Sequence, residues 1–78
     1  MFKLKDITIT GHTATMLVLI NCQEDRAYKL ALDMSGERFS VVETELPDDL
    51  ISYAGQVAAT LREYKGKEIP TELTVAWY

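Results

Sequence analysis

The sequence has little of what cross-links or anchors a small protein. One cysteine among 78 residues excludes an intramolecular disulfide framework and a four-cysteine zinc site. Two prolines and four glycines exclude collagen-like and low-complexity chains. The apolar run at residues 16–20 is far shorter than the roughly 20 residues that cross a bilayer. We therefore expect a cytoplasmic chain with no membrane contact, whose cysteine is a reduced thiol.

Basic side chains are also scarce. Eight Lys and Arg against twelve Asp and Glu give a net charge of −4. Non-specific nucleic-acid binding needs a surplus of basic side chains to neutralise phosphates. Tyr28, Phe39 and Trp77 could stack on bases, but they have the parity of core residues, and no RNP-type aromatic cluster surrounds them. We therefore expect no nucleic-acid partner.

Alternation of apolar and polar side chains is the main structural signal. The period of two that is typical of half-buried strands occurs over residues 4–10, 13–23, 26–34, 38–46 and 73–78. In the first stretch, the apolar residues before and after Lys5-Asp6 fall on opposite parities. This change of parity predicts a bulge near those two residues.

A helix is predicted from Pro47 to about residue 64, because proline is tolerated in a first helical turn and Gly66 is typical of a helix end. Apolar residues recur there at spacings of three and four, namely Leu50, Ala54, Val57, Leu61 and Tyr64, widened by Tyr53 and Ala58. One face of the helix is therefore apolar and should pack on a sheet.

The element order is thus ββββαβ within a single α+β domain of residues 1–78. If the first four strands form a meander, the helix carries the chain back across one face, and the last strand pairs with the first. We predict a five-stranded, mainly antiparallel sheet in the order 5-1-2-3-4 with one helix packed on one face.

Catalytic constellations are not found in the sequence. Cys22 and His12 are the sole residues of their types, and ten strand residues would separate them by about 33 Å, far beyond hydrogen-bond reach. The sequence has neither a phosphate-binding nor a dinucleotide-binding glycine motif, and no G-x-S-x-G nucleophile elbow. We therefore predict a non-enzymatic protein without catalytic residues, cofactor or metal site.

The sheet face opposite the helix should be polar, but parity places apolar residues on it. They are Leu17, Leu19, Ala31, Val42 and Ala76. A contiguous exposed apolar patch on a small protein usually marks an interaction site, although tight coiling of the sheet or a covering segment could bury these residues instead. We predict a protein-interaction domain that forms a homodimer through this open face or through an edge strand.

The net charge is localised. Residues 37–49 contain five acids and one base, so the rest of the chain is neutral. The concentrated part is Glu43, Glu45, Asp48 and Asp49, which we call the acidic patch. It suggests an alternative function, a small acidic regulator or inhibitor that docks a basic partner. The patch also has purely structural explanations, since charges on an edge strand oppose aggregation and Asp48 and Asp49 would favour a helix dipole.

Overall fold

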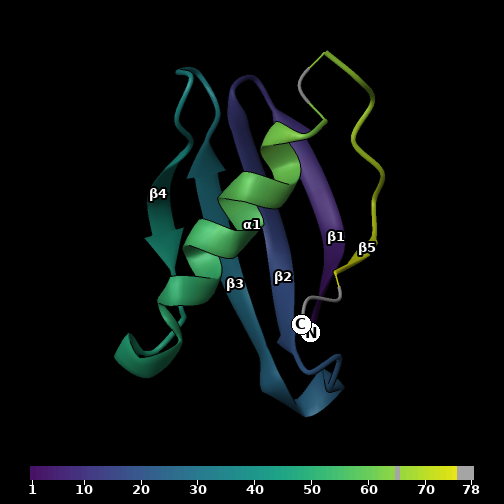
Figure 1. The fold of residues 1–78 in the computed structure, drawn as a ribbon, viewed down its shortest axis with the longest axis vertical. Coiled ribbons are helices and arrows are strands. Elements are labelled where there is room, and N and C mark those ends of the chain that lie inside the picture. Colours follow the sequence, from purple (N-terminus) through teal and green to yellow (C-terminus); the bar gives the residue numbers. More distant parts are fainter. Residues whose placement is uncertain (65, 76–78) are drawn as a thin grey trace.

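The computed structural model describes residues 1–64 and 66–75, and these form an antiparallel sheet crossed on one face by an α-helix (Figure 1). The elements are β1 (Phe2–Thr10), β2 (Thr13–Ile20), η1 (Glu24–Arg26), β3 (Ala27–Asp33), β4 (Ser40–Thr44), η2 (Asp48–Leu50), α1 (Ser52–Arg62) and β5 (Leu73–Val75). The strand order is β4-β3-β2-β1-β5. The predicted α+β fold and strand order are therefore confirmed.

The predicted bulge in β1 is present. The register between β1 and β2 shifts between Lys5 and Thr8, and Asp6 has a φ of 55°, a left-handed conformation that Asp adopts more readily than most residues. The bulge allows Phe2 and Ile7, which lie on opposite parities, to be buried in the same core.

The core lies between α1 and the sheet. Alternate residues of β2 point into it, namely Ala14, Met16, Val18 and Ile20. The helix contributes Ala54, Val57 and Leu61, which are all buried. Phe2 and Tyr53 add an edge-to-face contact with ring centroids 5.8 Å apart, an arrangement that aromatic pairs favour. The predicted helical stripe therefore packs on the predicted strand face.

Strand β2 ends earlier than expected. Asn21 and Cys22 have φ values of 53° and 59°, and the Gln23 N–H donates to the Ile20 carbonyl at 3.0 Å. Two successive left-handed residues close a tight turn whose twist suits antiparallel strands. The chain therefore leaves the sheet after Ile20 rather than after residue 23, and η1 follows.

The helix starts later than expected. Strand β4 ends where the Leu46 N–H donates to the Thr44 hydroxyl at 3.0 Å, and Leu46 is buried. Asp48 and Asp49 then lie in η2, a single 3₁₀ turn, and α1 begins only at Ser52. The aspartates therefore precede the α-helix instead of occupying its first turn.

The parity expected for β4 is wrong in its second half because this strand also contains a bulge. Val41 lies opposite Leu32 and Glu43 lies opposite Ala31, so Val42 is the extra residue. Thr44 consequently lies opposite the core residue Leu30, on the helix side. Strict alternation from Val42, which parity assigns to the open face, would instead place Thr44 on that face.

Two apolar residues on the helix side of the sheet are exposed. Ile9 and Val41 lie opposite core residues of the neighbouring strands, yet they are 43% and 47% exposed. The eleven residues of α1 span only about 16 Å, so the helix does not cover every position on its side of the sheet.

Candidate functional site

The open face of the sheet is built from residues that alternate with the core positions. Strand pairing places Leu17 between Lys5 and Lys29, in one row across β1, β2 and β3. The next row sets Leu19 between Lys3 and Ala27. Leu17 and Leu19 therefore project from the face that α1 does not cover, and neither belongs to the core cluster beneath the helix.

The five predicted interface residues differ widely in exposure. Leu19 and Ala31 are 2% and 7% exposed, whereas Val42 is 62% exposed. Leu17 is half-buried, and Ala76 lies outside the described residues. Apolar surface on this face is therefore offered by Leu17 at its centre, whereas Val42 is exposed at the bulge of the edge strand β4 and has no pairing partner that assigns it to this face.

Two ion pairs hold lysine side chains at this face. Lys5 Nζ lies 3.5 Å from Glu24 Oε1, which joins β1 to η1, and Lys3 Nζ lies 3.2 Å from Glu72 Oε1. Both pairs are substantially exposed, so each adds little stability. Each pair holds a lysine whose neighbour on β2 is a leucine, Leu17 for Lys5 and Leu19 for Lys3.

Charge is distributed unevenly across the open face. Lys3 and Lys5 lie on β1, and two strands, β2 and β3, separate β1 from the edge strand β4. Glu43 projects from β4 on the same face as Ala31, and Glu45 has the same parity. The face therefore has Lys3 and Lys5 along β1, each paired with a glutamate, and Glu43 and Glu45 along β4, with Leu17 and Lys29 between the two strands.

The acidic patch is exposed at all four positions, Glu43, Glu45, Asp48 and Asp49. Only Glu45 has a fixed partner among the described residues. Its carboxylate accepts the Lys29 N–H at 2.8 Å, and its own N–H donates to the Lys29 carbonyl at 2.8 Å. This carboxylate substitutes for a backbone acceptor where the strand ends. Across the described residues, no three acidic, histidine or cysteine side chains are grouped so that they could bind a metal.

The remaining titratable candidates lie at the ends of the strands. His12 precedes β2 and Cys22 follows it, so the two lie at opposite ends of that strand, as the sequence indicated. Near His12, the Ser35 N–H donates to Asp33 Oδ1 at 2.9 Å. The pKa of Asp33 is lowered by this backbone hydrogen bond first, and further by the Ser35 side chain and the nearby His12.

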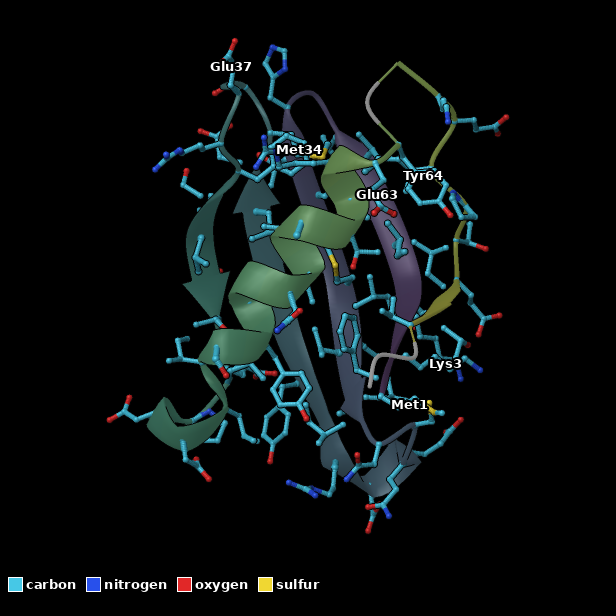
Figure 2. The ribbon with its side chains drawn as sticks, in the orientation of Figure 1. Met1, Lys3, Met34, Glu37, Glu63 and Tyr64 are labelled. Carbon is cyan, nitrogen blue, oxygen red and sulfur yellow. The ribbon has the colours of Figure 1, made fainter. Side chains whose placement is uncertain are left out.

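Two shallow hollows flank the C-terminal end of α1. One is lined by Glu37, Ala59, Arg62 and Glu63, and the other by Thr60 of α1, by Glu63 and Tyr64 just after the helix, and by the three residues of β5. Figure 2 shows Glu63 and Tyr64 at this end of the helix and Glu37 on the loop between β3 and β4. The lining groups can form hydrogen bonds and ion pairs. No spacing pattern in the sequence indicates either hollow, because the lining residues come from segments that are far apart along the chain.

Comparison of the chain with protein-family models, with curated proteins and with solved structures finds no match. The described residues contain no helix of the length and apolar character that spanning a membrane requires.

Proposed function

We propose that the protein is a non-catalytic interaction domain that self-associates through the open face of its sheet. The observation that carries this proposal is a sheet face that α1 does not cover, with Leu17 only half-buried on it and charges of both signs around it. Burial of a partly exposed leucine between two copies is favourable, and complementary charges would set their orientation.

The charge layout supports one arrangement of the two copies. A two-fold axis parallel to the strands, passing between β2 and β3, lays β1 of one copy over β4 of its partner. Lys5 of each copy then faces the acidic side of the other, near Glu43 and Glu45. The whole molecule measures 30 × 22 × 21 Å along its principal axes, so two copies have to meet over most of this face to approach the roughly 800 Å² per partner that stable interfaces bury.

Light scattering over a concentration series tests this proposal. Wild-type protein should approach twice its 8.8 kDa monomer mass as concentration rises, and Leu17→Glu should remain a folded monomer. Ile9→Glu is the matched control, because Ile9 is also partly exposed but lies on the helix side. A wild-type monomer at high micromolar concentration, or equal loss of association in both variants, would contradict the proposal.

A charge-swap experiment tests the orientation. Lys5→Glu alone and Glu43→Lys alone should each weaken association, since each places like charges together. The double variant restores complementary charges and should recover association to near the wild-type level. Additive weakening in the double variant would exclude this arrangement of the two copies.

The second candidate function is docking of a basic partner through the acidic patch. It is favoured by the exposure of all four carboxylates and by the absence of any ion pair to them among the described residues. The simplest test is binding to a cationic partner, which should weaken as salt is added. Reversing the charges of Glu43 and Asp49 should abolish this binding.

A further inference from the structure

The outer edge of β4 is a strand edge without a partner. β4 is the last strand on its side of the sheet, and four of its five residues are exposed. Apart from its ladder with β3, the described residues make one hydrogen bond to it, from Leu46 to the Thr44 side chain. Its outward backbone groups are therefore available to another strand.

The direction of these backbone groups follows from the strand end. The Glu45 N–H donates inward to Lys29. Because successive N–H groups of a strand point to opposite edges, the Thr44 N–H points outward. Val41 and Val42 are 47% and 62% exposed beside this edge. An incoming strand would therefore find both hydrogen-bonding groups and apolar side chains.

We propose that the β4 edge binds an extended basic segment of another protein, which adds a strand beside β4. This inference extends the second candidate function and is independent of self-association through the open face. Strand addition takes its affinity from backbone hydrogen bonds and its specificity from alternate side chains. Lysine or arginine at alternate positions would face the acidic patch, and apolar residues would contact the valines.

Charge argues against a second copy of β4 as the occupant. Residues 37–49, with five acids and one base, carry the whole net charge of the protein, so pairing two β4 edges would bring two such regions together. Like charges on adjoining strands destabilise their pairing. A basic segment removes the repulsion and replaces it with attraction.

The test uses a short fluorescent peptide in which lysine alternates with valine. Two control peptides have the same length: one has glutamate in place of lysine, and one has proline in place of the central valine. Anisotropy is measured on wild-type protein and on Leu17→Glu, so that failure of self-association and failure of peptide binding are read separately. The lysine peptide should bind both proteins, and the control peptides should bind at least about tenfold more weakly, since proline removes a ladder donor.

Protein variants locate the binding surface. Glu43→Lys with Asp48→Lys should weaken peptide binding by about tenfold, consistent with the loss of two exposed ion pairs and their replacement by repulsion. Asp25→Lys with Glu68→Lys makes the same change of net charge at exposed positions away from β4 and should have a much smaller effect. The Thr44 amide should exchange more slowly with solvent when the peptide is bound.

Three results would overturn the inference. Equal binding of the proline peptide would indicate charge attraction without strand addition. Equal weakening in the two double variants would indicate a response to net charge alone. Protection of the Thr44 amide that rises with protein concentration in the absence of peptide would indicate that a second copy occupies the edge.

Discussion

Leu17 and Leu19 provide the sharpest test of how the open face is built. Both lie on β2 and project from the same face, but Leu19 is 2% exposed and Leu17 is only half-buried. We predict that Leu19→Ala destabilises the protein much more than Leu17→Ala. Each substitution serves as the control for the other, because the strand, the residue types and the change in strand propensity are identical.

The expected magnitudes follow from burial. Truncating a buried leucine to alanine costs about 2–5 kcal/mol, and the cost is lower where surrounding groups can collapse into the cavity. Leu19 is covered from a face without a helix, next to the flexible side chain of Lys3, so we expect about 2 kcal/mol. For Leu17 we expect about 1 kcal/mol, because part of its surface is already in water.

Urea denaturation at two protein concentrations, with reductant present, measures both costs. With an m-value of about 1 kcal/mol per molar, typical of a small domain, Leu19→Ala should lower the midpoint by about 2 M and Leu17→Ala by about 1 M. If the open face joins two copies, only the Leu17→Ala cost should increase with protein concentration. Equal midpoints for the two variants would refute the description of Leu19 as shielded within one chain.

Two further predictions concern the strand ends. Cys22→Gly should raise the free energy of unfolding by about 0.5–1 kcal/mol, because glycine adopts the left-handed φ of this position without a steric cost. A lowered urea midpoint would contradict this prediction and would show that packing of the half-buried thiol outweighs the gain. The lowered pKa of Asp33 stabilises the fold above the ordinary value of 3.8, and this contribution is lost as the pH falls through the folded-state pKa. The free energy of unfolding should therefore be higher for wild type than for Asp33→Asn near neutral pH, and the difference should vanish in acid. A difference that does not change with pH would contradict the link between the Asp33 pKa and stability.

Strand order could be predicted because local pattern and connectivity restrict the topology. The alternation in β2 and the helical stripe of Ala54, Val57 and Leu61 each define one apolar face, and these two faces pack together. The bulge at Asp6 was predictable for the same reason, because two apolar parities within β1 can face one core only if the strand gains a residue.

The bulge in β4 could not be predicted in this way. Val41 and Val42 are adjacent and both apolar, so the alternation is ambiguous at the point where the extra residue lies. The late start of α1 was missed for a different reason. Residues 47–51 form a 3₁₀ turn in which the Leu50 N–H donates to the Pro47 carbonyl at 2.9 Å, and a short 3₁₀ turn before an α-helix leaves no separate signal in the spacing of apolar residues.

Shielding of Leu19 depends on groups that are distant in sequence. Parity correctly assigned its face, but its burial depends on what lies beside it: Lys3 on β1, Ala27 on β3, and η1, which the Lys5–Glu24 ion pair joins to β1. Parity describes only the direction of a side chain, whereas exposure depends on the length and anchoring of its neighbours. An apolar set read from alternation alone therefore overestimates the available apolar surface.

The two proposed surfaces differ in the interactions that would hold a partner. On the open face, the buried state of Leu19 and Ala31 leaves Leu17 as the central contact, so association there has to depend strongly on the complementary charges of β1 and β4. At the β4 edge, backbone groups provide the attraction and the acidic patch selects the partner. Association through the open face should accordingly weaken steeply with added salt, whereas strand addition at β4 should retain a salt-resistant component, because backbone hydrogen bonds are screened much less than exposed ion pairs.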